Sequence, residues 1–350
     1  MRQVGALLGE RGVAAIYLVH GTPLGPDALD LLTRLQRFFP EAARRLRPAV
    51  IQLADHWTGD VGNYTESYAH HFEQGINRRG DCSIPVRLFH WSNENHHLGR
   101  ADGAVRLIDE LASLDLKPGE RVLLWGHGHA GNVFALATNL LSGNQEAIQR
   151  FFRAAEIYYR WPILGCVDIP VWSRVHSLLV KRRCPIADIP LDIVTFGTPV
   201  CYGWDSAGYS RLLHFINRRV LRGSVEPRAS FPLKLEDVLA AAEGDYVQQL
   251  AIAGTNVRPS LFSWRAWLAD RRLERLLDPD TPQENPLDRF RAGTILPDEG
   301  TTLLVDYGEA EGSLSEHHAG HAVYTRKQWL LFHAEEVARR FYEAEARQVA

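Results

Sequence analysis

The segment Arg121–Leu141 (RVLLWGHGHAGNVFALATNLL) carries the pattern in this chain that predicts chemistry most directly. Its apolar start predicts a buried strand, small residues from Gly126 to Gly131 predict a tight turn, and apolar residues at helical spacing predict a helix. Strand, crowded turn and helix in this order are the setting of a nucleophile elbow, G-x-S-x-G. Position 128, where the serine would stand, is glycine. The segment therefore predicts a scaffold for a nucleophile that the chain lacks.

A histidine-rich loop near the end of the chain could supply a general base. His317, His318 and His321 follow an expected strand, Thr301–Asp306, and precede a long amphipathic helix. Imidazole exchanges protons near neutral pH, which suits it to this role. We favour His321, because Gly320 lets the backbone approach its neighbours closely, and we place His318 second.

Alternating apolar runs and amphipathic segments predict the elements that hold these residues. Besides the elbow strand, strands are expected over Val13–Val19, Pro48–Leu53, Val86–Trp91, Leu191–Phe196, Leu212–Ile216, Tyr246–Ala253 and Thr301–Asp306. Helices are expected over Asp27–Phe39, Arg100–Leu114, Asn132–Leu141 and Arg326–Ala346. This alternation predicts βαβ units and the α/β class, with a doubly wound, mostly parallel sheet.

Taken together, these features resemble the α/β-hydrolase superfamily of esterase and lipase type. The matching pieces are HGT at 20–22 after the first strand, GHGHAG at 126–131, FGTP at 196–199, and the late histidine loop. The resemblance covers most of the chain and implies one α/β-hydrolase domain over residues 1–350. It also implies a triad in the chain order serine, Asp or Glu, histidine, with an oxyanion hole made by backbone N–H groups.

On this resemblance, Gly128 holds the nucleophile position, and Gly21, Thr22 and His129 frame the oxyanion through the backbone N–H groups of Thr22 and His129. Gly128 can adopt a positive φ without strain, so the turn survives without its serine. Natural loss and engineered replacement both account for a glycine here. The alternative is that the segment is only a Gly-rich turn between a strand and a helix.

The acid is the least determined member of the triad. The stretch Ala251–Pro259 resembles the strand and turn that usually carry the aspartate, but it offers Asn256. An amide orients an imidazole tautomer without stabilising an imidazolium by charge. Asp245 and Asp306 are the alternatives, and the sequence leaves the choice open.

Two segments interrupt the regular alternation of strands and helices. Residues 149–181 are rich in aromatic side chains and contain Pro162 and Pro170. They predict either a helical cap inserted over a pocket or a pair of helices that packs on the core. Residues 263–297 combine a helical stretch with a Pro- and Asp-rich loop and are expected to form a surface excursion.

The remaining histidines support a rival interpretation, in which several imidazoles gather and bind a metal. The candidates are His70, His71, His96, His97, His127, His129 and the group at 317–321. No H-E-x-x-H spacing is present, and we expect neither a metal nor a cofactor. A metal-dependent hydrolase is therefore one alternative, and a non-catalytic ligand-binding protein on the same fold is the other.

The composition limits the kinds of partner and site that we expect for this chain. The formal net charge of −3 over 350 residues gives no electrostatic reason for binding nucleic acid. Four cysteines lie far apart without C-x-x-C spacing, which argues against a thiolate zinc site or a disulfide framework. No window approaches 18 apolar residues, so no transmembrane segment is expected.

The N-terminus lacks an uninterrupted apolar stretch, so we expect a cytoplasmic protein, although export without a signal peptide would look the same. The expected ligand is a small-molecule or lipid ester. Activity should be weak or absent, because removing a triad nucleophile costs orders of magnitude in rate. Acyl chain length and oligomeric state stay open.

Overall fold

A computed structural model describes residues 1–21, 62–77, 83–161, 166–219, 234–252, 259, 263–278 and 294–343. Within these residues, six strands form one sheet in the order β2-β1-β3-β4-β5-β6, and every pairing is parallel. The strands are β1 (Val13–Val19), β2 (Val86–Phe89), β3 (Arg121–His127), β4 (Leu191–Phe196), β5 (Arg211–Asn217) and β6 (Thr301–Val305). The predicted α/β class and mostly parallel sheet are confirmed.

The central strands are buried on both faces, which is why they read as continuous apolar runs. Successive side chains alternate between the two faces, so that Leu124 packs in one core cluster while Leu123 and Trp125 pack in the other. The edge strand β6 is only half-buried.

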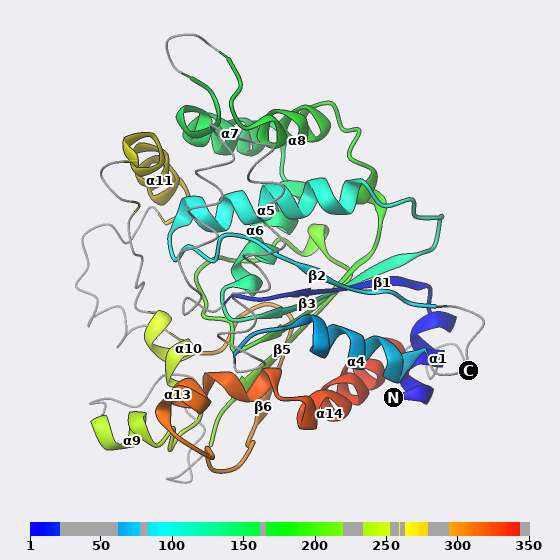
Figure 1. Cartoon of the computed structure of the whole chain (residues 1–350). Helices are drawn as coiled ribbons and strands as arrows, with labels where there is room; N and C mark the ends of the chain where they lie inside the picture. The colour runs from blue at the N-terminus through cyan, green and yellow to red at the C-terminus, as the bar shows by residue number, and fades with distance from the viewer. Residues whose placement is uncertain are drawn as a thin grey trace.

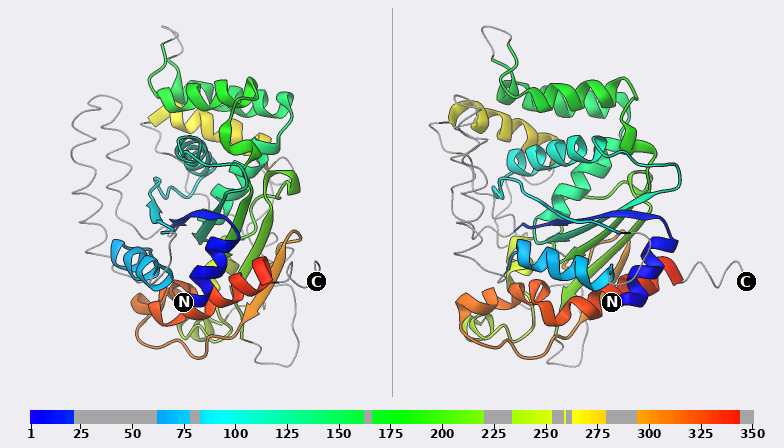
Figure 2. Two further views of the ribbon diagram at one scale, coloured as in Figure 1. Left: turned by 90° about the vertical axis from the view of Figure 1, so that its right-hand side faces the viewer. Right: turned by 45° about the vertical axis from the view of Figure 1, so that its right-hand side comes forward.

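Helices cover both faces of this sheet (Figures 1 and 2). One face carries α1 (Arg2–Glu10), α4 (Glu66–Ile76) and α14 (Lys327–Ala338). The other carries α5 (His97–Ala112) and α6 (Ala130–Ser142). Shorter elements connect the strands and helices: α9 (Leu235–Leu239), α10 (Tyr246–Ala251), α13 (Leu314–His317), η1 (Pro185–Asp188), η2 (Ser206–Gly208) and η4 (His318–Thr325). The π turn η5 (Arg339–Glu343) continues α14.

Three further helices, α7 (Gln145–Tyr159), α8 (Pro170–Val180) and α11 (Trp264–Leu277), form an outer layer beyond α5 (Figure 1). Phe151, Tyr158 and Trp172 are buried in the core on this side of the sheet. The indole N–H of Trp172 donates to Asp102 Oδ1 of α5 at 2.7 Å. In their described part, residues 149–181 therefore pack as a pair of helices, with Trp172 of α8 against α5. The cap over a pocket, the other alternative, stays a prediction.

Of the surface excursion expected at 263–297, the structure describes mainly the helical part, α11. Helix α11 packs on α7 and α5 and buries Ala269 and Leu273 completely. Its apolar face explains this position, since it completes the core shared by the outer helices. Residues 279–293, which hold the Pro- and Asp-rich loop, lie outside the described part of the chain.

The strand expected at Tyr246–Ala253 is wrong, because Tyr246–Ala251 is helix α10. The side chain of Asp245 caps this helix by accepting a hydrogen bond from Gln248 N at 2.9 Å. The pattern of a short apolar run is compatible with a strand or with a helix. Here the cap at Asp245 favours the helix. The strand expected at Pro48–Leu53 and the helix expected at Asp27–Phe39 lie outside the described residues.

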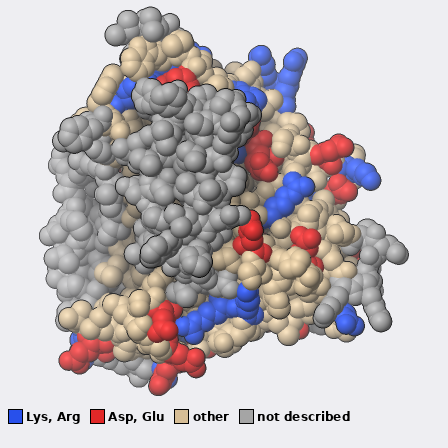
Figure 3. Space-filling model, viewed as in Figure 1, with Lys and Arg blue, Asp and Glu red and all other residues tan. Residues whose placement is uncertain are grey.

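None of the helices that the structure describes combines the length and apolar character needed to cross a membrane. On the face drawn in Figure 3, basic and acidic side chains of the described residues lie interspersed.

Candidate active site

The predicted elbow lies where β3 ends in the middle of the sheet. Gly128 connects β3 to α6 with φ +57°, a conformation that favours glycine. Its N–H donates to the carbonyl of Phe196 at 2.9 Å, and its carbonyl accepts from Thr198 Oγ1 at 2.8 Å. The FGTP segment after β4 thus holds the elbow from the neighbouring strand.

Small residues around the elbow are required by close backbone approach. A Cβ on Gly131 would overlap the side chain of Thr198, and one on Gly126 would overlap Phe134. A Cβ on Gly21 would lie 2.5 Å from His127 O and 2.6 Å from His129 N. The glycine after β1 therefore sits directly against the elbow, and no side chain fits there.

The loop that carries the candidate base reaches this turn from the end of β6. His321 is buried, and its Nε2 lies 3.0 Å from the point where a Cβ on Gly128 would be. His318, Ala319 and Gly320 precede it with φ values of 47°, 50° and 89°. Consecutive left-handed residues store strain, and such strain is concentrated at functional sites.

Contacts with neighbouring segments hold this strained loop. Asn217 Nδ2, at the end of β5, donates to Gly320 O at 3.1 Å, and His127 Nε2 lies 3.0 Å from His321 O. The rings of His127 and His321 also lie 4.2 Å apart between centroids. Of the two histidines considered from sequence, His321 faces Gly128, while the buried Nδ1 of His318 has no hydrogen-bond partner among the described residues.

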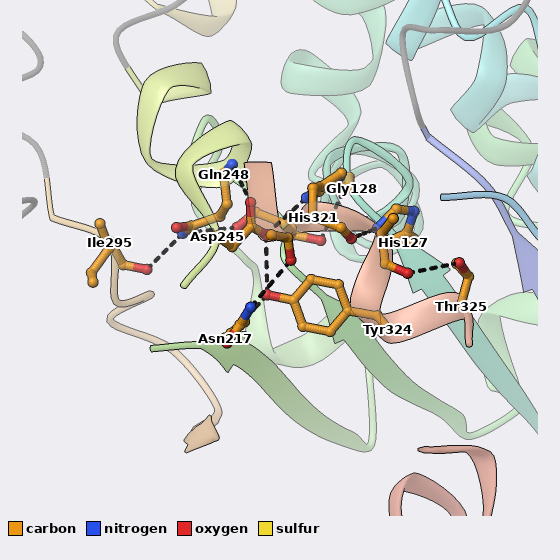
Figure 4. A network of polar contacts seen from close by, with 12 residues as sticks. His127, Gly128, Asn217, Asp245, Gln248, Ile295, His321, Tyr324 and Thr325 are labelled. Carbon is orange, nitrogen blue, oxygen red and sulfur yellow. Dashed lines mark hydrogen bonds and ion pairs between the residues drawn. The ribbon is translucent and has the colours of Figure 1, made fainter. Parts of the chain in front are cut away.

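Asp245 is the acidic residue that meets His321 (Figure 4). Its Oδ2 lies 2.8 Å from His321 Nδ1 and accepts a hydrogen bond from the Tyr324 hydroxyl at 3.0 Å. Asp306, the other carboxyl considered from sequence, is exposed and accepts from Gly308 N within its own loop at 2.9 Å. Asn256 lies outside the described residues.

The chain brings Asp245 to the site by returning to the end of β5. Asp245 N donates to Asn217 O at 3.0 Å, next to a bridge between Arg218 and Gly244. Gly197, at φ +57°, gives the carboxyl group room, because a Cβ there would overlap Asp245 Oδ2. The glycine of FGTP thus permits the contact between Asp245 and His321.

Sequence reasoning missed Tyr324, Asn217 and Gly197 as residues of this site. Tyr324 donates to Asp245 and accepts from Asn217 N at 2.7 Å, so one hydroxyl joins two strand-end segments. Its place three residues after His321, within the same short turn, was the available signal.

Of the two expected oxyanion donors, only the N–H of His129 belongs to the described residues. His129 N donates to Gly21 O at 3.3 Å, and His129 is one of the residues that line the adjoining cavity. Thr22 lies outside the described residues. The oxyanion role of Gly21, Thr22 and His129 therefore stays a prediction.

A cavity of about 150 Å³ adjoins Gly128. Its wall combines apolar and polar groups from six segments: Gly21, Asn95, Gly128, His129, Pro199, Val247, Gln248, Leu250, Ala251 and His321. A space of this size holds a group about as large as benzene. None of the described residues within 149–181 lines it, in agreement with the packing of α7 and α8.

Burial keeps the imidazoles around the elbow neutral. It lowers the pKa of His127 and of His129 well below the usual 6.5; the Arg100 guanidinium lowers the pKa of His129 further, and a protonated His321 would lower both. Burial also lowers the pKa of His20 to about 3. The pKa of Tyr324 is raised well above 10 by burial and by Asp245, so its hydroxyl stays a donor. Among the described residues, His321 thus faces the neutral side chains of His127 and Tyr324 and the carboxyl group of Asp245.

In the part of the chain that the structure describes, the other histidines considered as metal ligands have separate partners. His70 lies 2.8 Å from Gln74 on α4, His96 caps α5 by accepting from Gly99 N, and His97 contacts Tyr202. Among the residues that the structure describes, no group of three or more His, Cys, Asp or Glu is placed to hold a metal ion.

Comparison of this chain with protein-family models, with curated proteins and with solved structures finds no match.

Proposed function

We propose that this chain is an α/β-hydrolase-fold protein related to carboxylic-ester and lipid hydrolases, with Gly128 at the position of the serine nucleophile. One observation carries the proposal. The imidazole of His321 spans from Asp245 Oδ2, at 2.8 Å from Nδ1, to the Cβ point of Gly128, at 3.0 Å from Nε2.

Chain order supports the same assignment. Positions 128, 245 and 321 follow the order nucleophile, acid, histidine that is typical of α/β-hydrolases, whereas chymotrypsin and subtilisin use other orders. The left-handed turn after a central parallel strand supplies the matching backbone.

Each residue has a defined role in this proposal. With a serine at 128, His321 takes the hydroxyl proton, Asp245 orients the imidazole and stabilises its charge, and the serine oxygen attacks the acyl carbon. The cavity of about 150 Å³ favours an ester of a short acid. With glycine at 128, no acyl-enzyme forms on this residue.

The test is the variant Gly128→Ser. We expect it to hydrolyse p-nitrophenyl propionate and to be labelled by a fluorophosphonate, with the adduct located at residue 128 by mass spectrometry. The matched control is Gly128→Ser with His321→Ala, which keeps the hydroxyl and removes the base. A folded Gly128→Ser protein that neither turns over nor reacts would overturn the proposal in favour of a ligand-binding protein.

A further inference from the structure

The imidazole of His129, like that of His321, belongs to a residue that lines the cavity beside Gly128. His129 is the N-cap residue of α6 and is only 6% exposed. The accessible part of its ring includes Nε2, which has no hydrogen-bond partner among the described residues. Because a buried polar group is normally paired, an unpaired ring nitrogen in a cavity wall points to a ligand with a complementary group.

Asn132 determines which nitrogen of the His129 ring carries the proton. Asn132 Nδ2 donates to Pro199 O at 3.1 Å, so the amide group is oriented with its nitrogen toward this carbonyl. The same nitrogen lies 3.2 Å from His129 Nδ1 and donates to it. Nδ1 is therefore the acceptor of the ring, and the proton of the neutral imidazole is assigned to Nε2. His129 thus offers an N–H donor at the cavity.

The surroundings of His129 keep its ring neutral. Burial lowers the pKa of His129 well below 6.5, the positive charge of Arg100 lowers it further, and a protonated His321 acts in the same direction. The N-cap position adds to this, because the N-terminus of a helix disfavours a cation. A neutral imidazole donates a hydrogen bond to a carbonyl oxygen and keeps its proton. The charge of Arg100 also favours negative charge on an oxygen beside His129.

The main-chain N–H of His129 already has a partner inside the protein, because it donates to Gly21 O at 3.3 Å. We propose that the neutral imidazole of His129 binds the carbonyl oxygen of a short ester or amide through Nε2–H, in place of the main-chain N–H expected from sequence. The inference rests on the proposed function, since it takes the ligand to be a carbonyl compound that fills the cavity of about 150 Å³.

This contact gives His129 a catalytic role in the Gly128→Ser protein. When the serine oxygen attacks the acyl carbon, the electron pair of the carbonyl double bond moves onto the carbonyl oxygen, and the serine proton passes to His321 Nε2. The Nε2–H of His129 stays in place and stabilises the oxyanion. The two rings therefore have opposite roles, since His321 accepts a proton and His129 keeps its own.

The first test uses the unsubstituted protein and needs no catalysis. Long-range ¹H–¹⁵N NMR at pH 7 should identify His129 as a neutral ring protonated at Nε2, and propionamide should shift this signal. His129→Phe keeps a ring and lacks the donor, so it should weaken propionamide binding, followed through the signals of His321, by on the order of 10-fold. His129→Gln ends in an N–H donor and should restore most of the affinity. His176→Phe is the matched control, since His176 lies on α8 and is not among the residues that line the cavity.

The second test adds the same substitutions to Gly128→Ser. His129→Phe should lower kcat with p-nitrophenyl propionate about 10²–10³-fold, the usual cost of removing one oxyanion donor, with a smaller change in KM. His129→Gln should recover part of kcat, whereas a ring with a purely structural role would be missed equally in both variants. Circular dichroism and thermal melting establish that each variant is folded.

Three results would overturn the inference: a His129 ring that is charged or protonated at Nδ1 at pH 7, a His129 signal that propionamide leaves unchanged, or a folded Gly128→Ser, His129→Phe protein as fast as Gly128→Ser. Should the His129→Phe variants fail to fold, the NMR measurements on the unsubstituted protein decide. An inactive Gly128→Ser protein whose parent binds propionamide through His129 would remove the proposed function alone. An active Gly128→Ser protein that is indifferent to His129→Phe would remove this inference alone.

Discussion

His321 and Asp245 stand 76 positions apart in the chain, yet His321 Nδ1 and Asp245 Oδ2 lie 2.8 Å apart in the folded protein, with both side chains shielded from solvent. A buried imidazole beside a buried carboxyl group has its orientation and tautomer fixed. The opposite ring nitrogen, His321 Nε2, faces Gly128 and the cavity. The pair of His321 and Asp245 therefore determines which proton transfers are available at this turn.

Asp245→Asn should abolish most of the activity of the Gly128→Ser protein. The amide still accepts from Tyr324 but no longer stabilises the imidazolium, and in serine proteases the corresponding change lowers kcat about 10⁴-fold. The measurement is kcat with p-nitrophenyl propionate. Asp306→Asn is the matched control, because Asp306 is exposed and lies in its own loop. Equal losses in the two variants would contradict the assignment of the acid.

Tyr324→Phe should destabilise the protein and loosen the contact between Asp245 and His321. It removes a donor to Asp245 Oδ2 and leaves Asn217 N without its acceptor, in a buried place where such a loss costs about 1–3 kcal/mol. Urea denaturation measures the change in the free energy of unfolding. The pH dependence of kcat in the Gly128→Ser background should change as well, which a purely structural hydroxyl would not cause.

Gly197→Ala should lower the stability of the fold more than Gly119→Ala does. Both glycines have positive φ, at 57° and 90°, so both variants incur the same kind of backbone strain. A Cβ at Gly119 meets no atom within 4 Å, whereas one at Gly197 overlaps Asp245 Oδ2. We expect an extra loss of about 1–3 kcal/mol at Gly197, as for other overpacked sites. Equal melting temperatures for the two variants would contradict this packing.

Trp172→Ala should cost about 3–5 kcal/mol of stability, the usual range for a fully buried large aromatic side chain. The preference among short esters of the Gly128→Ser protein should stay the same, because the cavity includes no residue of α8. Trp161→Ala is the control, since Trp161 is 38% exposed. A changed ester preference at unchanged stability would restore the cap interpretation of residues 149–181.

Lowering the pH should reduce the free energy of unfolding, because histidines are buried in the neutral form. Burial lowers the pKa of His333 to about 3. As the pH falls below 6.5, the unfolded chain binds a proton that the folded chain refuses, so stability is complete above pH 6.5 and declines toward pH 3. The slope is about 1.4 kcal/mol per pH unit for each such group.

Urea denaturation between pH 6.5 and pH 4 measures this slope. His333→Gln should reduce it by the contribution of one histidine, and His70→Gln, on the exposed side of α4, is the matched control. A slope that is identical in all three proteins would show that His333 takes no part in the acid response.

The sequence alone determined the elements whose signals are local. Continuous apolar runs marked β1, β3, β4 and β5, because central parallel strands are covered on both faces. The turn at Gly128 was readable because a left-handed turn at a close approach of strand and helix admits only small residues. The position of the late histidine loop followed from the order of the elements.

The tertiary structure alone decided which side chains meet. The sequence left Asp245, Asp306 and Asn256 open for the place beside the histidine, and only the return of the chain to Asn217, together with the space at Gly197, placed Asp245 beside His321. In the same way, the described part of residues 149–181 became an outer layer. Periodicity reports the environment of one face of one segment, whereas these outcomes depend on contacts between segments far apart in the chain.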